Sequence, residues 1–164
     1  MRLSTLLRFY GARKRRDLEW FPPYWLMGIK MLDTGDNWRR VRICLPLRLC
    51  TRNMGGTMFG GSQASLADPI PAIACAHLFP DWAVWTKDLR LRFLKTGNSD
   101  LELRFDFDPA TEAGIARDLA EKGRSDPHFE FGFYRQDGQL CTQVYNTVAI
   151  RPKGYKSQAG AYQP

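Results

Sequence analysis

The feature that most restricts the fold of this chain is a strict alternation of apolar and polar residues in several separate segments. In residues 39–45, the apolar Val41, Ile43 and Leu45 alternate with two arginines and a cysteine, and residues 101–108 alternate throughout. A strand with this pattern buries one face and exposes the other. The segments therefore predict an antiparallel sheet with a single apolar face, which another element has to cover.

Turn residues between these segments predict which strands are neighbours, because Gly, Asp and Asn are typical of tight turns. Three hairpins are predicted, formed by residues 29–33 with 39–45, 83–93 with 101–108, and 129–135 with 139–151. A short helix precedes the third hairpin, since Pro109 suits a first helical position and Gly123 a helix end. About six strands are expected.

One long apolar segment lacks the period of two and is rich in small residues. It runs from Gly60 to about Phe79, and its spacing predicts a helix with little room around it. Because the apolar face of the sheet needs a cover, the sheet is expected to wrap around this helix. The predicted fold class is α+β, with a curved antiparallel sheet around a central helix.

A single carboxylate, Asp68, lies in the middle of this small-residue segment. Burying an unpaired carboxylate is costly, so it is expected to be capped, paired or used. One interpretation is a helix start, with Asp68 as N-cap and Pro69 as the first helical residue. The other is a continuous helix, in which the prolines at 69 and 71 leave two carbonyls without donors. Those carbonyls, of Ser65 and Ala67, could then bind a substrate amide.

Length and composition are those of one globular domain. The chain has 164 residues, 44% of them hydrophobic, and no apolar run approaches the roughly 20 residues that span a membrane. The four cysteines are scattered and only two histidines are present, so neither a zinc site nor a cofactor is expected. The thiols are interpreted as reduced core thiols of a cytoplasmic protein.

Charge divides the chain unevenly. Lys and Arg number 12 against 4 acidic residues in residues 1–52, a net charge of +8, and 12 against 13 in residues 53–164, a net charge of −1. A local positive field suits the phosphates of coenzyme A, an anionic membrane surface or nucleic acid. Nucleic acid is the least expected of these, because a single basic cluster is a thin signal.

The charge pattern also suggests how the chain is divided. Residues 1–21 are interpreted as a basic amphipathic helix that suits peripheral membrane contact, with a cleaved targeting peptide as the alternative. Residues 22–152 form the expected main domain, and residues 153–164 a loose tail.

The motif "FGGSQASLAD", residues 59–68, resembles the helix-start motif of hotdog thioesterases of the phenylacetic-acid-degradation type, in which His-Gly-Gly is followed by six residues and an acidic residue. The ordered segments "PPYWLMGIKM", "RVRICLPLR", "RNMGGTMFGG" and "VWTKDLRLRFLKTG" resemble an uncharacterised branch of that superfamily. The resemblance covers most of residues 22–152. It implies a hotdog fold and hydrolysis of acyl thioesters, usually acyl-coenzyme A, by a homodimer or a dimer of dimers with sites between subunits.

On this resemblance, the backbone N–H groups of Gly60 and Gly61 would polarise the thioester oxygen, because donors at a helix start are unpaired and lie at the positive end of the helix dipole. Asp68 would act as general base on water or as the nucleophile. Asn53, also assigned to the catalytic group, and Thr57 are neutral groups that could hold the water or the acyl amide.

The remaining candidates for substrate contact are Met58, Phe59 and Trp85 as walls of an acyl pocket, Ser65 through its carbonyl, and the cations Lys87 and Arg92. Arg90, Arg92 and Lys95 could meet the phosphates of coenzyme A. Charges on a half-exposed strand also form a solvated face, and arginines on an edge strand prevent aggregation.

Phe59 stands where the family motif has His, and this leaves two functions open. The retained Asp68 favours thioester hydrolysis. Loss of the histidine favours a non-catalytic hotdog protein that binds acyl chains or acyl-coenzyme A as a carrier or sensor. A dehydratase or hydratase fits less well, since that chemistry needs an Asp and His pair, and His77 is separated from Asp68 by two prolines.

Overall fold

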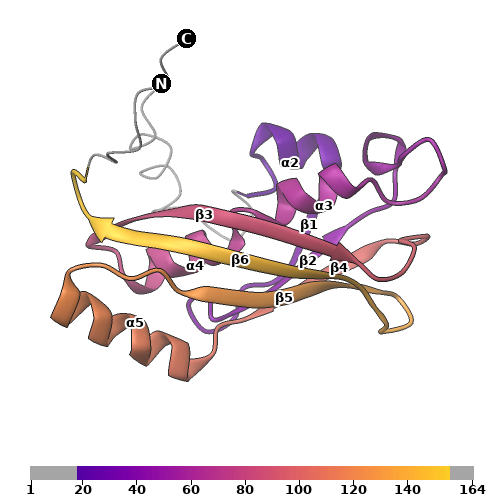
Figure 1. The fold of residues 1–164 in the computed structure, drawn as a ribbon. Helices are drawn as coiled ribbons and strands as arrows, with labels where there is room; N and C mark the ends of the chain where they lie inside the picture. The colour runs from indigo at the N-terminus through magenta and orange to yellow at the C-terminus, as the bar shows by residue number, and fades with distance from the viewer. Residues whose placement is uncertain (1–17, 156–164) are drawn as a thin grey trace, which may run out of the picture.

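The computed structural model describes residues 18–155, which form a curved antiparallel sheet around two consecutive helices (Figure 1). In chain order the elements are α2 (Pro22–Met27), β1 (Lys30–Asp33), β2 (Arg40–Leu45), the short 3₁₀-helix η1 (Leu49–Thr51), α3 (Gly60–Ala67), α4 (Ile70–Leu78), β3 (Trp82–Phe93), β4 (Leu101–Asp106), α5 (Pro109–Lys122), β5 (His128–Arg135) and β6 (Leu140–Pro152). Most of the predicted N-terminal helix and of the predicted tail lies outside the described residues. Within residues 18–155, no helix has the length and apolar character needed to cross a membrane.

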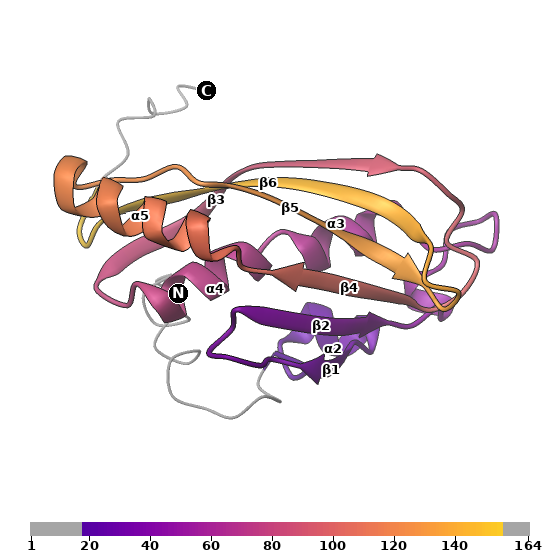
Figure 2. The same ribbon diagram turned by 90° about the horizontal axis from the view of Figure 1, so that it is seen from below.

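The six strands lie in the order β1-β2-β4-β5-β6-β3, and α3 and α4 lie inside the curve that they form (Figure 2). The alternation read from the sequence explains this arrangement. In β2, Val41, Ile43 and Leu45 are fully buried while the residues between them are at least partly exposed. The predicted α+β class, with a hotdog arrangement of a curved sheet around a small-residue helix, is confirmed.

Two of the three predicted hairpins are confirmed, since β1 pairs with β2 and β5 pairs with β6. The hairpin predicted between β3 and β4 is wrong. β4 lies between β2 and β5, whereas β3 pairs with β6 and forms one edge of the sheet. The physical reason is that β3 follows α4 and packs beside it. β3 therefore joins the sheet beside β6 and not beside β4.

The central helix runs from Gly60 to Leu78 with a change at Asp68. Helical geometry begins after Phe59, the N-cap of α3. Asp68 itself has helical backbone angles (φ −48°, ψ −57°), and its N–H donates to the carbonyl of Ala64 over 2.9 Å. The interpretation of Asp68 as the N-cap of a new helix is therefore wrong. Pro69 is helical as well (φ −86°, ψ −10°), because proline removes a donor but its fixed φ suits a helix.

The short helix α5 is the one predicted from its sequence. It buries Ile115 and Leu119 and ends at Gly123, whose φ of 63° lies in the left-handed region that favours glycine. In Figure 1, α5 and α2 lie on opposite sides of the long strands.

The four cysteines are free, but they are not all core thiols. Cys75 and Cys141 are buried as predicted, whereas Cys44 is partly exposed and Cys50, in η1, is exposed. Burial raises the pKa of the Cys75 thiol to about 12, so this thiol stays protonated and unreactive at neutral pH.

Candidate functional site

The start of α3 presents two backbone N–H groups without an acceptor. Those of Ser62 and Gln63 donate to the carbonyl of Phe59 over 3.1 and 3.3 Å, but within residues 18–155 no acceptor is found for the N–H of Gly60 or Gly61. First-turn donors of a helix lie at the positive end of its dipole. These two groups can therefore bind an oxygen atom that gains negative charge.

Two half-exposed aromatic rings flank these glycines. A Cβ atom at Gly60 would lie 2.8 Å from the ring of Phe93, and one at Gly61 would overlap the ring of Phe59. Phe59 is 53% exposed and Phe93 58% exposed. The sequence analysis named Phe59 but missed Phe93. The alternation along β3, which puts Phe93 on the helix-facing side of the strand, is the signal that could have identified it.

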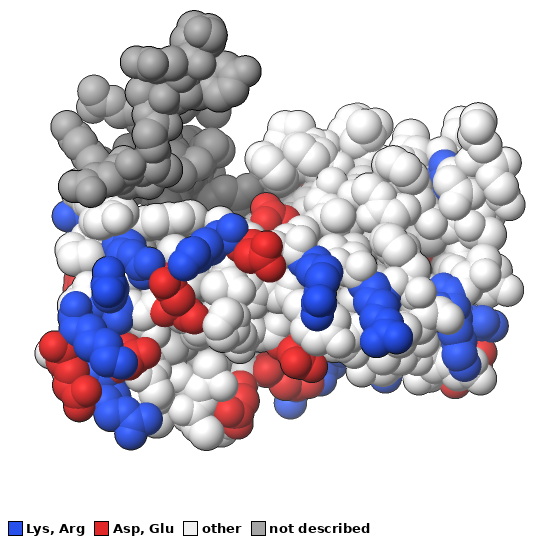
Figure 3. Space-filling model, viewed as in Figure 1, with Lys and Arg blue, Asp and Glu red and all other residues white. Residues whose placement is uncertain are grey.

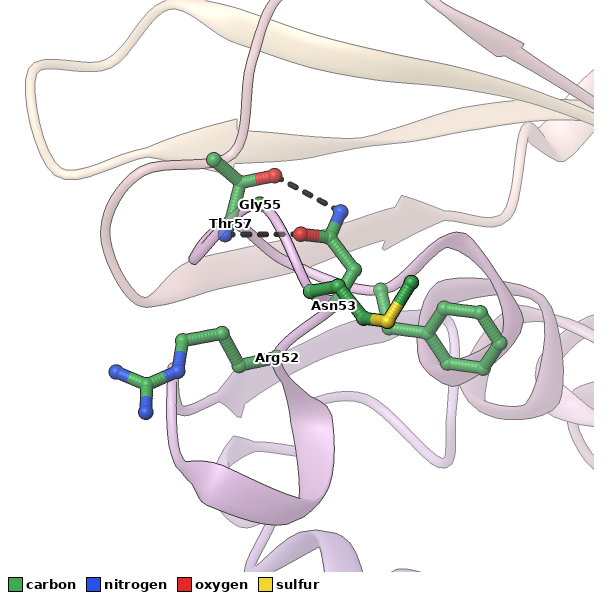
Figure 4. Close-up of a pocket in the computed structure, with 6 residues that line it drawn as sticks. Arg52, Asn53, Gly55 and Thr57 are labelled. Atoms are coloured by element: carbon green, nitrogen blue, oxygen red, sulfur yellow. Dashed lines mark hydrogen bonds between the residues drawn. The ribbon is translucent and has the colours of Figure 1, made fainter.

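A loop before α3 carries Asn53 and Thr57, and the structure brings these two side chains together (Figure 4). The amide nitrogen of Asn53 donates to the hydroxyl of Thr57 over 2.9 Å, and its oxygen accepts from the Thr57 N–H over 3.1 Å. The loop borders an open hollow of about 610 Å³ that is lined by Arg52, Asn53, Met54, Gly55, Thr57 and Phe59. Met58, at the end of the loop, is buried and does not line the hollow.

Asp68 lies at the other end of α3 and is exposed, and no hydrogen bond or ion pair of its carboxylate is found among residues 18–155. Its carbonyl accepts from the hydroxyl of Thr86 over 2.7 Å and from the side-chain amide of Asn146 over 3.1 Å. The neighbouring carbonyl of Ser65 accepts from the hydroxyl of Tyr24 over 3.0 Å. Ser65 therefore has a donor within the protein where a substrate amide was expected.

Trp85, Lys87 and Arg92 belong to β3 but are not brought to the start of α3. Trp85 stacks on Tyr155 with ring centroids 6.1 Å apart, and Lys87 forms an ion pair with Asp126 at 3.1 Å. Arg92 is exposed and precedes Phe93, so strand alternation puts it on the opposite face from that ring. Figure 3 shows Lys and Arg side chains in a row across this face, while the part over α2 is almost free of charge.

The two ends of α3 are far apart for one reaction centre. Asp68 lies seven positions after Gly61, which at 1.5 Å per residue is about 10 Å along the helix axis. A thioester carbon next to the glycine N–H groups can therefore meet a carboxylate in two ways. Either a water molecule lies between the carbon and Asp68 of the same chain, or a second copy supplies the carboxylate.

Comparison with known proteins agrees with the fold. A family model described as "Domain of unknown function (DUF4442)" matches residues 20–150, and none of the curated proteins matches the sequence. A Pseudomonas aeruginosa protein of unknown function, described as a probable thioesterase, is 18% identical, with a TM-score of 0.74 over 93% of this chain and 98% of its own.

Two further solved structures share the fold at lower TM-scores. A thioesterase from Haemophilus influenzae is 14% identical, with a TM-score of 0.60 over 94% of each chain. A mutant thioesterase enzyme from Staphylococcus aureus is 16% identical, with a TM-score of 0.60 over 77% of this chain and 95% of its own. At these identities the likeness shows the fold alone.

Proposed function

Because the chain belongs to the family described as a domain of unknown function, DUF4442, we propose its function from its own site and from the thioesterases that share its fold. The proposed activity is hydrolysis of acyl thioesters, with acyl-coenzyme A as the substrate class. One observation carries the proposal. The N–H groups of Gly60 and Gly61, for which the described part of the chain offers no acceptor, lie between two half-exposed phenyl rings that suit an acyl chain.

In the proposed reaction, these N–H groups bind the thioester oxygen and stabilise the charge that develops on it. The Asp68 carboxylate takes a proton from water, and the water oxygen bonds to the acyl carbon. The carbon–sulfur bond then breaks, and the proton passes to the departing thiolate. In the alternative route the Asp68 carboxylate attacks the carbon itself, the carbon–sulfur bond breaks to release the thiolate, and water then hydrolyses the resulting anhydride and supplies the proton that the thiolate takes up.

We propose that a homodimer, alone or as a dimer of dimers, completes the site. β3 is an edge strand of 12 residues, and an exposed strand edge readily pairs with another chain. The start of α3 lies beside this edge, through the contact between Gly60 and the Phe93 side chain. A second copy paired there can supply the partner subunit's Asp68, which resolves the distance of about 10 Å within one chain.

The phosphates of coenzyme A are assigned to cations on the outer face of β3. Lys87, Arg90 and Arg92 are exposed on this strand, and Lys95 follows it. The guanidinium of Arg90 lies over the ring of Tyr145 at 4.4 Å, which leaves its edge open to an anion.

Thiol release from short, medium, long and aryl esters of coenzyme A tests the proposed activity. Wild type is expected to hydrolyse at least one ester, and Asp68→Asn to lose most of that rate while its circular dichroism spectrum is unchanged. Asp81→Asn is the matched control, because Asp81 is also exposed but lies before β3, away from α3. An Asp68→Asn protein as active as wild type would contradict the assignment.

Mixing two inactive variants tests the shared site. Asp68→Asn and Gly61→Val copies, expressed together, restore one intact site per mixed dimer only if the glycine donors and the carboxylate come from different chains. Activity above that of either variant supports this arrangement. No gain, with mixed dimers shown by mass spectrometry, places both groups of each site in one chain.

A carrier or sensor of acyl-coenzyme A is the second candidate function. Two observations favour it: Phe59 occupies the position of a histidine in the similar motif, and no hydrogen bond within residues 18–155 orients the Asp68 carboxylate. If wild type releases no thiol but binds an acyl-coenzyme A by calorimetry, this function replaces hydrolysis.

A further inference from the structure

The junction between α3 and α4 replaces helical hydrogen bonds with side-chain ones. Pro69 has no N–H, so the carbonyl of Ser65, four residues earlier, loses its helical donor and accepts from the Tyr24 hydroxyl instead. The helical pattern resumes where the N–H of Ile73 donates to the carbonyl of Pro69 over 2.8 Å. The backbone between these points is held from outside the helix.

The Asp68 carbonyl lies at the centre of this junction and is bonded from two neighbouring strands. The Thr86 hydroxyl reaches it from β3 over 2.7 Å, and the Asn146 amide reaches it from β6 over 3.1 Å. Thr86 lies where the register between β3 and β6 shifts, with Lys87 as the extra residue. Such a bulge changes the direction of a side chain, and here it accompanies the hydroxyl that meets the helix.

Asn146 is an unexpected residue at this position. It is 2% exposed, and its Oδ1 atom is buried without a hydrogen-bond partner among residues 18–155. A leucine of similar size would avoid that unsatisfied acceptor. Among residues 18–155, the one hydrogen bond found for its side chain runs from Nδ2 to the Asp68 carbonyl, so that bond is the best explanation for an amide in this part of the core.

We propose that Thr86 and Asn146 are positioning residues for the Asp68 carboxylate. Two donors on one carbonyl fix the backbone of Asp68 against the sheet, and this fixes the point on the helix from which its exposed side chain extends. This inference rests on the proposed function, because only in thioester hydrolysis does the Asp68 carboxylate act as the base or nucleophile. A shift of about 1 Å in a reacting group can lower a rate about 100-fold, so this degree of fixation matters for catalysis.

Two substitutions remove one donor each. Thr86→Val and Asn146→Leu are each expected to lower kcat for the best ester about tenfold, and together about 100-fold, with little change in KM. Thr86→Ser keeps the hydroxyl and is expected to keep the rate. Asn146→Leu also removes the unsatisfied acceptor, so its melting temperature is not expected to fall. Thr147→Val is the matched control, because the Thr147 hydroxyl lies next to Asn146 but contacts His128.

The decisive measurement adds Thr86→Val to Asp68→Asn. If Thr86 acts through the carboxylate, the double variant is no slower than Asp68→Asn alone. The inference would be overturned if Thr86→Val lowered kcat as much in the Asp68→Asn background as it does in wild type, since Thr86 would then act independently of Asp68.

The remaining outcomes separate this inference from the proposed function. Wild-type rates in Thr86→Val and Asn146→Leu, beside an inactive Asp68→Asn, overturn the inference alone. A wild type that hydrolyses no ester, or an Asp68→Asn protein with full activity, overturns the proposed function and the inference together. If Asn146→Leu does not fold, the Thr86→Val and Thr86→Ser pair decides, because Thr86 is only partly buried.

Discussion

The two ends of α3 are held in different ways. At its start, the N–H groups of Gly60 and Gly61 have no acceptor within the described residues 18–155, and the adjacent rings of Phe59 and Phe93 are more than half exposed. At its end, side chains from α2, β3 and β6 donate to the carbonyls of Ser65 and Asp68. The end is anchored by the rest of the fold, whereas among residues 18–155 no acceptor is found for the first donors at the start.

A further hydrogen bond, between the two ends of α3, fixes the helix to the sheet without using the N–H groups of Gly60 and Gly61. The Thr142 hydroxyl of β6 donates to the side-chain oxygen of Gln63 over 2.6 Å, and both residues are buried. Apart from the hydrogen bond from Tyr24 of α2, the anchoring hydrogen bonds of α3 and its C-terminal end therefore come from strands β3 and β6. The anchoring contacts and the proposed oxyanion donors thus involve different residues of the same helix, so that each group can be changed separately.

The largest expected effect is a loss of activity on substitution at the start of α3. Gly61→Ala places a methyl group against the Phe59 ring, where the thioester carbonyl has to approach the N–H, and kcat/KM is expected to fall about 100-fold. Steady-state thiol release measures this. Gly114→Ala in α5 is the control, because its new methyl group meets nothing closer than 4.0 Å. Equal activity in the two variants would show that the start of α3 is not used.

A smaller effect is expected where the sheet holds the helix. Thr142→Val leaves the buried Gln63 oxygen without its donor and is expected to lower the free energy of unfolding by about 1–3 kcal/mol. Guanidinium denaturation measures it, and the native protein should keep its kcat. A change below about 0.5 kcal/mol would mean that the pair is not an anchor.

Substitution of Phe93, the exposed ring beside Gly60, should affect substrate binding rather than stability. Phe93→Ala removes a ring that is 58% exposed, and it is expected to raise KM for long-chain esters about fivefold, which is about 1 kcal/mol of lost apolar contact. Leu32→Ala, at a similarly exposed residue on β1, is the control. If both variants leave KM unchanged, Phe93 is not an acyl wall.

The smallest effect is expected far from both ends of α3. Arg39 donates two hydrogen bonds to Glu112, over 2.7 and 2.8 Å, and holds the pKa of that carboxyl below its usual value. A lowered pKa in the folded state stabilises the protein above the unfolded value of about 4.3, and this contribution is lost as the pH falls through the folded pKa. Glu112→Gln should therefore melt slightly below wild type at pH 7 and closer to it below about pH 4. Thiol release at pH 7 should be unchanged, and a lower rate would link this ion pair to the site.

Local sequence patterns predicted the strands and helices far better than they predicted which strands pair. The alternation in β2 and β4 and the signals at Pro109 and Gly123 depend on neighbours in the chain, and these elements formed as expected. The hairpin between β3 and β4 failed because strand pairing follows how the sheet closes around α3 and α4.

In the candidate site, too, the features that depend on local sequence were predicted, and those that depend on distant residues were not. The Gly-Gly pair was predictable because unpaired donors are a local property of a helix start, which the structure has at Gly60. Phe93 was missed because it comes from a strand more than thirty residues away, and the Asp68 N-cap was wrongly read from Asp-Pro, a pattern that a nearly continuous helix also accepts.

By itself the sequence determined the strands, the small-residue helix and the pair of glycines at the helix start, since each depends on residue type and short spacing. Only the tertiary structure decided that Trp85 and Lys87 lie away from α3, that Phe93 lies beside Gly60, and that Thr86 and Asn146 hold Asp68. The reason is that a sheet brings distant residues together through its register and its curvature, and neither is a local property of the chain.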